Sequence, residues 1–253
     1  MSHEHEDIEQ KLQFLGLSYL QNNWNQVLKD ANKQKHSYHR FLSQLIEREY
    51  AEKQERKRKL RLQRANIPES LVMETFPFNK QPKLRKQFVM ELYDSLEYMT
   101  NAQDMLFIGP TGCGKTGLAT AYLIHAINQG YRGYFTDFSD LLDNLYRSIA
   151  DHSEEKIIKK FSKYDILVID EMGYNTIDPE KASLFFNLMK KRHKTKTTLI
   201  TTQLGYDEWG NFIQDEHMLA GLVNRLTENI IVFDMQKCKS LRPKNIRHAT
   251  KKE

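Results

Sequence analysis

The sequence has no long apolar run. None of its hydrophobic stretches approaches the roughly 20 consecutive apolar residues that a helix needs to cross a bilayer. The first residues, Met1 to Asp7, are polar and partly acidic, and they lack the basic start and apolar centre of a secretory signal. We therefore expect neither a transmembrane helix nor secretion.

Cysteine is also scarce. Cys113 and Cys238 are too few for a disulfide framework, which fits a reducing, cytoplasmic setting. The nine histidines are scattered and share no metal-ligand spacing with the cysteines. The sequence therefore predicts a cytoplasmic protein without a zinc site.

Positive charge is concentrated in two places. The net charge is +5, yet residues 53–64 hold seven cations against Glu55 alone, and residues 237–252 hold seven cations and no acid. The rest of the chain is therefore acidic. Two basic patches on an acidic body are typical of a protein that binds a polyanion, although short basic runs are also common on solvated helix faces.

The first 64 residues have a helical pattern. Apolar residues recur at spacings of three and four over 12–28, as one stripe, and again over 41–50. Glycine and proline are absent between Leu17 and Asn66, so we expect the cations of 53–64 to project from the end of a long helix. Residues 1–64 are predicted to be a small helical module that binds DNA or a protein partner.

Prolines and strand–helix repeats divide the remainder. Three prolines between residues 66 and 82 favour an extended linker or strap, and a helix is expected over 84–99, so that 65–103 leads into the next domain. A core over 104–236 then alternates strands and helices, which predicts an α/β fold with a central parallel sheet covered on both faces. A basic tail, 237–253, follows. The expected strands are 105–108, 134–136, 165–170, 197–202 and 230–233.

The strongest motif begins after the first of these strands. Its pattern, G-x-x-x-x-G-K-T, stands between a strand and a helix, where a glycine-rich loop wraps its N–H groups around phosphates. We expect Lys115 to reach the β- and γ-phosphates of ATP and the Thr116 hydroxyl to ligate Mg²⁺. The predicted nucleotide-binding residues are Gly109, Pro110, Thr111, Gly112, Cys113, Gly114, Lys115, Thr116 and Gly117.

Two acids follow the third expected strand. Because four apolar residues precede Asp170 and Glu171, their carboxylates should emerge at the carboxyl end of a buried strand, beside the phosphate loop. Asp170 is expected to hold Mg²⁺ and Glu171 to polarise the attacking water. Lys115 and Glu171 are therefore candidate catalytic residues.

Two further polar residues are candidates for catalysis, each with an ordinary alternative. Gln203 ends the next strand, where it either senses the γ-phosphate or faces solvent. Arg225 either completes a neighbouring subunit's site or forms an intramolecular ion pair. Between the second and third strands, four cations either line a nucleic-acid track or form a solvated face. They are Arg147, Lys156, Lys159 and Lys160.

With these motifs the chain resembles the IstB-like ATPases, helper proteins of insertion-sequence transposases that are related to the DnaC and DnaI helicase loaders. The resemblance covers nearly the whole chain, and the segments that narrow the choice are Asp-Glu-Trp-Gly at 207–210 and Asn-Arg-Leu at 224–226. It differs from the family pattern at Gln203, usually asparagine, at Cys113, often valine, and in the basic tail from Lys244 onward.

The resemblance implies an AAA+ fold without the usual helical lid, assembly into homo-oligomers on DNA, and recruitment or stimulation of a transposase. Combined with the residues, it predicts an ATPase that binds ATP and Mg²⁺ at subunit interfaces and holds the DNA backbone through its basic patches. Two alternatives stay open: a replicative helicase loader with the same ATPase core, and a DNA-binding scaffold in which the nucleotide is only a structural switch.

Overall fold

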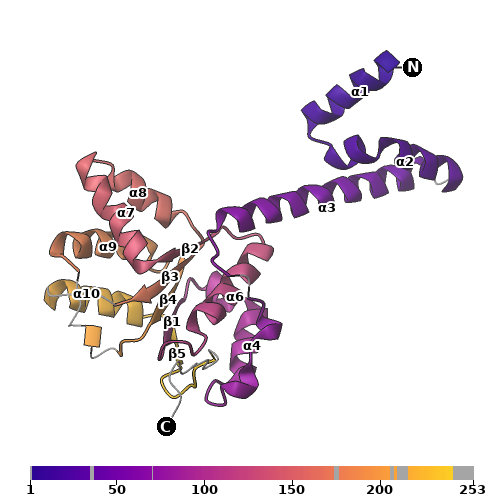
Figure 1. Ribbon diagram of the computed structural model, residues 1–253. Helices are drawn as coiled ribbons and strands as arrows, with labels where there is room; N and C mark the ends of the chain where they lie inside the picture. The colour runs from indigo at the N-terminus through magenta and orange to yellow at the C-terminus, as the bar shows by residue number, and fades with distance from the viewer. Residues whose placement is uncertain are drawn as a thin grey trace, which may run out of the picture. The chain divides into compact units, whose positions relative to one another are not determined.

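The computed structural model describes residues 2–34, 37–69, 71–173, 177–205, 208–209 and 216–241. The chain divides into two compact units, Met1–Arg61 and Leu62–Glu253. The first is helical, and the second is built around a parallel sheet (Figure 1). No helix in the described part of the chain is long and apolar enough to span a membrane.

The helical unit begins with two helices that Gly16 separates. Helix α1 (Ser2–Leu15) ends because Gly16 adopts a left-handed φ of 69°, and the Leu17 N–H then bonds back to the Leu12 carbonyl at 2.9 Å. Helix α2 (Ser18–Gln34) follows. The apolar pattern expected as one stripe is thus divided between two helices.

The core of this unit is small. Leu12, Leu20 and Val27 are buried there, with Trp24 and Phe41 packed against them.

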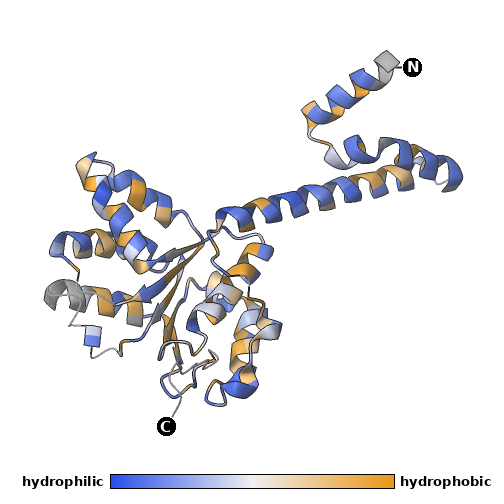
Figure 2. Cartoon of the chain, in the orientation of Figure 1, coloured by the Kyte–Doolittle hydropathy of each residue, from blue (hydrophilic) through white to orange (hydrophobic). Residues whose placement is uncertain are grey.

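Helix α3 (Tyr38–Arg64) carries the first basic patch. It contains no buried residue among those described and is mostly hydrophilic (Figure 2). Glu55, the single acid of the basic stretch, accepts from Arg58 at 2.6 Å, and this contact lowers the pKa of its carboxyl. The remaining cations of the stretch therefore keep a strong excess of positive charge.

The proline-containing segment packs on the second unit as a strap. It begins at the edge of the sheet, where the Ala65 carbonyl accepts from the Phe135 N–H at 2.8 Å. Two short 3₁₀ turns, η1 (Met73–Thr75) and η2 (Phe78–Lys80), follow. Met73 is fully buried and Phe76 nearly so, because both belong to the main apolar core.

The single helix expected over 84–99 is in fact two. Helix α4 runs from Lys86 to Ser95 and α5 from Glu97 to Thr100. Leu96 breaks the pair with a left-handed φ of 55°. The break turns α5 so that Tyr98 and Met99 are both buried, which the spacing of apolar residues does not reveal.

The sheet has five parallel strands in the order β2-β3-β4-β1-β5. All five lie where the sequence predicts strands, and the α/β fold with a central parallel sheet is confirmed. Strand β4 stands between β1 and β3, so the loops that follow these three strands open at one edge of the sheet. The strands are β1 (Asp104–Ile108), β2 (Gly133–Asp137), β3 (Ile166–Met172), β4 (Thr197–Thr202) and β5 (Ile230–Asp234).

Helices cover both faces of this sheet (Figure 1). Alternate strand residues point to opposite faces, so Met105 and Phe107 join one core cluster while Leu106 and Ile108 join the other. Helices α4, α5 and α6 (Lys115–Asn128) cover the first face. The second face is covered by α7 (Phe138–Ala150), α8 (Glu154–Ser162), α9 (Pro179–Arg192) and α10 (Glu216–Thr227).

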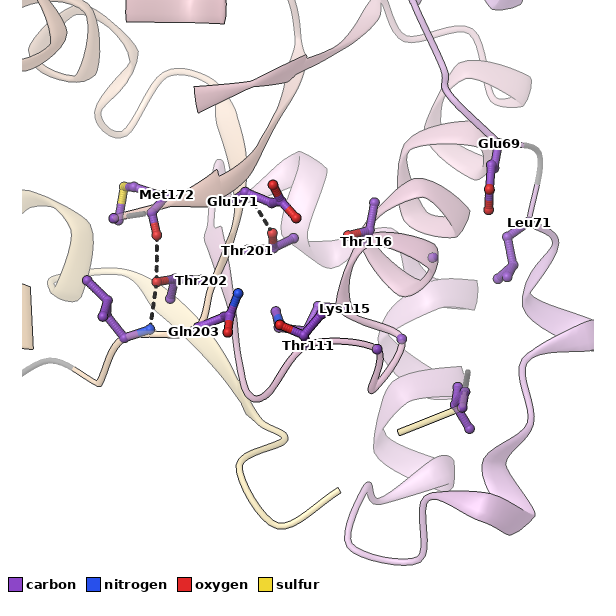
Figure 3. A pocket seen from close by; sticks show the side chains of 16 residues that line it. Glu69, Leu71, Thr111, Lys115, Thr116, Glu171, Met172, Thr201, Thr202 and Gln203 are labelled. Atoms are coloured by element: carbon purple, nitrogen blue, oxygen red, sulfur yellow. Dashed lines mark hydrogen bonds between the residues drawn. The ribbon is translucent and has the colours of Figure 1, made fainter. Parts of the chain in front are cut away.

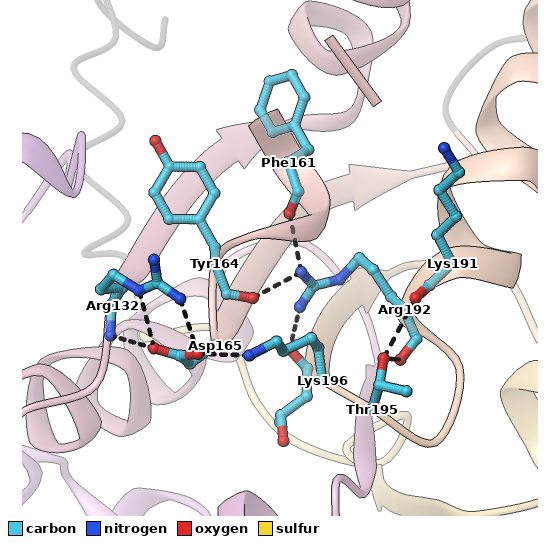
Figure 4. A network of polar contacts seen from close by, with 9 residues as sticks. Arg132, Phe161, Tyr164, Asp165, Lys191, Arg192, Thr195 and Lys196 are labelled. Atoms are coloured by element: carbon cyan, nitrogen blue, oxygen red, sulfur yellow. Dashed lines mark hydrogen bonds and ion pairs between the residues drawn. The ribbon is translucent and has the colours of Figure 1, made fainter. Parts of the chain in front are cut away.

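A buried arginine ties the amino-terminal edge of the sheet together (Figure 4). The Arg192 side chain is 1% exposed and donates to the carbonyls of Phe161, Tyr164 and Thr197 at 2.6–2.9 Å. Burial lowers its pKa to about 10, and burial raises the pKa of nearby Asp104 to about 7. One guanidinium thereby fixes the end of α8 to the starts of β3 and β4.

Replacing Arg192 by methionine should destabilise the protein strongly, because three carbonyls, two of them in buried contacts, lose a charged donor at once. We expect the free energy of unfolding to fall by roughly 3–5 kcal/mol, measured by urea denaturation. Lys191→Met is the matched control, since Lys191 is exposed. Equal stability of the two variants would contradict this role for Arg192.

Candidate active site

A hollow of about 520 Å³ opens at the carboxyl edge of the sheet, where the loops after β1, β3 and β4 meet (Figure 3). The phosphate loop and the start of α6 form its floor, residues 171–173 and 201–204 form one wall, and Glu69, Leu71 and Leu241 form the other. The structure therefore brings together segments that the sequence separates by more than a hundred residues.

The phosphate loop has little room for larger side chains. Gly112 and Gly114 adopt φ of 80° and 100°, and a Cβ at Gly114 would stand 3.0 Å from the Phe76 ring. A Cβ at Gly109 would lie 2.7 Å from the carbonyl oxygen of Met235. Helix α6 begins at Lys115, directly after Gly114, so the free N–H groups at the start of the helix point toward the loop.

Most of the predicted nucleotide-binding residues line the hollow, but three do not. Thr111, Gly112, Gly114, Lys115, Thr116 and Gly117 are in its lining. Gly109 and Pro110 lie behind it, and their carbonyls accept from the Lys115 ammonium at 2.6 and 3.0 Å. Cys113 is fully buried beneath the loop, where burial raises the pKa of its thiol and it packs as a small apolar residue.

Asp170 meets the phosphate loop as expected. The Thr116 hydroxyl donates to its carboxylate at 2.9 Å, and Thr201 donates to the same Oδ1 at 2.5 Å. Burial raises the pKa of Asp170, although the two hydroxyl donors and Lys115 favour its ionised form.

The Thr116 hydroxyl and the Asp170 carboxylate together suit a magnesium ion. Described residues include no group of three or more His, Cys, Asp or Glu that could hold a metal by themselves. Mg²⁺ is commonly held by one or two protein oxygens, with phosphate and water oxygens completing its shell. Thr116 and Asp170 therefore fit a magnesium ion that arrives with a nucleotide.

Glu171 is turned toward the hollow by an irregular backbone. Its φ of 56° is left-handed, and the pairing of β3 with β4 shifts register between Ile169 and Met172. Its side chain is exposed in the hollow, whereas Asp170 and Met172 on either side are buried. A non-glycine residue in this conformation stores strain of about 1 kcal/mol or more, and such strain is typical of functional sites.

Thr201 is hydrogen-bonded to both Asp170 and Glu171, a role that was not predicted from the sequence. Its hydroxyl donates to Asp170. The same hydroxyl accepts the Glu171 backbone N–H at 3.0 Å (Figure 3). Thr202 beside it donates to the Met172 carbonyl at 2.8 Å. The sequence feature that points to this role is the pair of threonines at the end of a fully buried strand, where apolar residues would otherwise be expected.

Of the two weaker candidates, one reaches the hollow and one does not. Gln203 lines it on the same wall as Glu171, with its side chain exposed. Arg225 is absent from the lining; its guanidinium donates to the Gly221 carbonyl at 2.8 Å and stacks 4.6 Å from the centre of the Phe186 ring. The roles of both residues stay predictions.

A carboxyl-terminal strap, residues 235–241, supports the phosphate loop. The Leu241 N–H donates to the Gly112 carbonyl at 2.8 Å. Gln81, fully buried, donates to the carbonyls of Cys113 at 2.9 Å and Lys239 at 2.7 Å, and accepts the Lys239 N–H at 3.1 Å. Gln81 is thus the clamp between loop and strap.

Parts of the remaining motifs lie outside the described residues. Of the basic tail, Lys237 and Lys239 are exposed on the strap, and the residues from 242 onward are not described. The same holds for Asp207 and Gly210 of the Asp-Glu-Trp-Gly segment. Within that segment Trp209 is fully buried in the second core cluster.

Comparison with known proteins agrees with this geometry. A family model described as "IstB-like ATP binding protein" matches residues 10–249. The chain belongs to the IstB-like ATP-binding family. This membership and the α/β phosphate-loop fold confirm the predicted resemblance, and the protein is an ATPase.

Two relatives of this IstB-like protein are ATP-binding proteins of insertion sequences. That of IS5376 from Geobacillus stearothermophilus is 31% identical over 88% of this chain and 88% of its own length. That of IS21 from Pseudomonas aeruginosa is 29% identical over 91% of this chain and 86% of its own. In structure, the chain is similar to a crystal structure of DnaI, with a TM-score of 0.55 and 14% identity over 64% of this chain and 89% of that one.

Thr201→Val should slow ATP hydrolysis about 10- to 100-fold, because Asp170 loses a donor and the Glu171 N–H loses its acceptor. Thr201→Ser, which keeps the hydroxyl, should retain most of the activity. The measurement is phosphate release over a range of Mg²⁺ concentrations, with circular dichroism to verify folding. A valine variant that turns over at the wild-type rate would remove Thr201 as a positioning residue.

Proposed function

We propose that this protein is an ATP-dependent DNA-binding helper of an insertion-sequence transposase. The observation that supports this most is a family match over residues 10–249, with relatives named as insertion-sequence ATP-binding proteins along nearly their whole length. In this proposal the protein works in the cytoplasm, assembles on DNA as a homo-oligomer and recruits or stimulates the transposase encoded with it.

The active-site geometry supports a division of labour among its residues. Lys115 leaves the carbonyls of its own loop for the β- and γ-phosphates of ATP, while Thr116 and Asp170 hold Mg²⁺, which neutralises charge on the phosphates. Glu171 orients the attacking water from the wall of the hollow, and Gln203 beside it contacts the γ-phosphate or that water. The strained backbone of Glu171 holds its carboxylate toward the phosphates.

Arg225 does not line the active site of its own chain, which is consistent with a role in the active site of a neighbouring subunit. It lies on α10, outside the lining of the hollow. In an oligomer with head-to-tail contacts, an arginine from one subunit can complete the site of the next. Hydrolysis would then depend on assembly, and assembly on DNA.

The basic stretches supply the proposed contact with DNA. Residues 53–64 of α3 carry seven cations of which only Arg58 and Lys59 pair with Glu55 in the described residues. Together with the tail that follows Leu241, these cations suit the phosphate backbone, whose binding is largely independent of sequence.

A replicative helicase loader is the second candidate, favoured by the similarity to the DnaI structure. In that case the helical unit grips a helicase instead of DNA. Co-purification of the tagged full chain with the transposase and, separately, with the replicative helicase of the same organism discriminates the two. Capture of the helicase alone would overturn the transposition proposal.

Glu171→Gln should bind ATP within about threefold of the wild-type affinity but hydrolyse it at least about 100-fold more slowly, since an amide cannot activate water. The ATP-bound assembly should then persist on duplex DNA, as measured by native gel shift with phosphate release in parallel. Glu69→Gln is the matched control, because Glu69 lines the same hollow away from the acids. Wild-type turnover in Glu171→Gln would exclude it as the base.

Mixing two inactive variants should restore activity if Arg225 acts between subunits. Arg225→Ala subunits keep the loop, and Lys115→Ala subunits keep the arginine. In an equal mixture about one interface in four combines both intact residues, so up to about a quarter of the wild-type phosphate release is expected. Activity that stays at the level of the separate variants would contradict action in trans; Arg147→Ala, an exposed arginine on α7, controls for loss of charge.

A further inference from the structure

A second hollow, of about 530 Å³, lies on the sheet-containing unit at the start of β2 and β3. Five cations surround it: Arg132 before β2, Lys156, Lys159 and Lys160 on α8, and Lys163 at the end of that helix. All five are exposed. We refer to these five residues as the α8 cluster. Apart from these cations, the hollow is lined by Ile157 and Tyr164.

Three lysines of the same unit are paired with acids, whereas others in the described part of the chain, such as Lys83 and Lys86, are not. Lys181 pairs with Asp143, Lys194 with Glu228 and Lys196 with Asp165. Among described residues, the four lysines of the cluster form no such ion pair.

Acids near the cluster do not cancel its charge. Asp165 is already shared by Arg132 at 3.3 Å and Lys196 at 2.6 Å; although burial alone would raise its pKa, these cations hold it below the usual value. Glu154 and Glu155 stand in the first turn of α8, where the helix dipole favours negative charge. The pKa of Asp151, just before α8, is lowered by the Ser153 hydroxyl and also by Lys156. With Lys196 counted, six cations stand against four acids in this region, so the face keeps a net positive charge.

The cluster is mounted on a rigid base. On its inner side α8 buries Ile158 and Phe161 in the second core cluster. Tyr164 stacks on Tyr134 with 4.9 Å between ring centres, and its carbonyl is held by Arg192 at 2.8 Å (Figure 4). The fold therefore fixes the backbone positions that carry these charges relative to one another.

The spacing of these cations suits a repeated anion. From residue 156 to 163 a helix rises about 10 Å, which matches the axial length of roughly three phosphates of one DNA strand. A single small phosphate is held instead by donors that converge on one point, usually with backbone N–H groups. The core of a protein–protein interface is depleted of charged residues, whereas this hollow is surrounded by five cations.

We propose that the α8 cluster is a binding site for the phosphodiester backbone of duplex DNA. It rests on the proposed function, since it assumes that the protein binds DNA, and it adds a contact surface on the ATPase unit to the basic stretches of α3 and the tail. Binding there depends on charge and spacing, and is independent of base sequence.

The test is a triple variant of the full chain, Lys156→Gln, Lys159→Gln and Lys163→Gln, with ATP present. Affinity for a fluorescent duplex is measured by anisotropy at several salt concentrations. Each lost phosphate contact reduces the slope of log K against log salt by about 0.9, so the slope should become shallower by about 2 to 3. The matched control is Lys83→Gln, Arg85→Gln and Lys86→Gln, which removes the same charge beside α4 on the other face of the sheet.

The outcomes separate this proposal from the proposed function. A shallower slope in the α8 variant alone supports the site, and its basal ATP hydrolysis should equal that of the wild type, which verifies folding. An unchanged slope, or an equal change in the control, overturns the site while leaving DNA binding intact. The absence of salt-dependent DNA binding in the wild type would overturn both. Loss of transposase binding with an unchanged DNA slope would assign the cluster to a protein partner instead.

Discussion

The carboxylate of Asp170 is the point on which the active site depends, because it joins three segments of the chain. Thr116 binds it from the start of α6, Thr201 binds it from β4, and it stands itself at the end of β3. These contacts follow from the strand order. Strand β4 lies between β1 and β3, so a short hydroxyl side chain at its carboxyl end is within reach of both the phosphate loop and the acids.

Segments before and after the sheet of the second unit also contribute residues to the active site. The strap before the sheet contributes Leu71 and Gln81, and the strap after it contributes Leu241. Because Gln81 bonds to both the loop and residue 239, a displacement of either strap changes the hydrogen bonds behind the phosphate loop. Leu241 lines the hollow, and the basic residues from 242 onward follow it directly in the sequence.

Features of the fold and the site can be predicted from the sequence where they depend on neighbouring residues, and not where they depend on contacts between distant ones. The five strands are short segments rich in apolar, aromatic and β-branched residues. The phosphate loop and Asp170-Glu171 are contiguous motifs, and the segments beside them show which strand each one follows. By contrast, Gln81 and Thr201 are ordinary polar residues whose roles arise from contacts 158 and 31 positions away. The break at Leu96 is likewise tertiary, because a left-handed leucine is unfavourable locally and persists only where the burial of Tyr98 and Met99 compensates.

The proposed DNA contact at the α8 cluster is far from the acids of the active site. Five residues of extended strand separate Asp165 from Asp170, a distance of roughly 17 Å. A DNA contact that affects ATP hydrolysis would therefore have to act over this distance. Strand β3 is the direct connection, since it begins just after Tyr164 and carries Asp170 and Glu171 near its end. Arg192 holds the start of this strand to α8 and β4, so a displacement of α8 by bound DNA would be passed to β3 through its guanidinium.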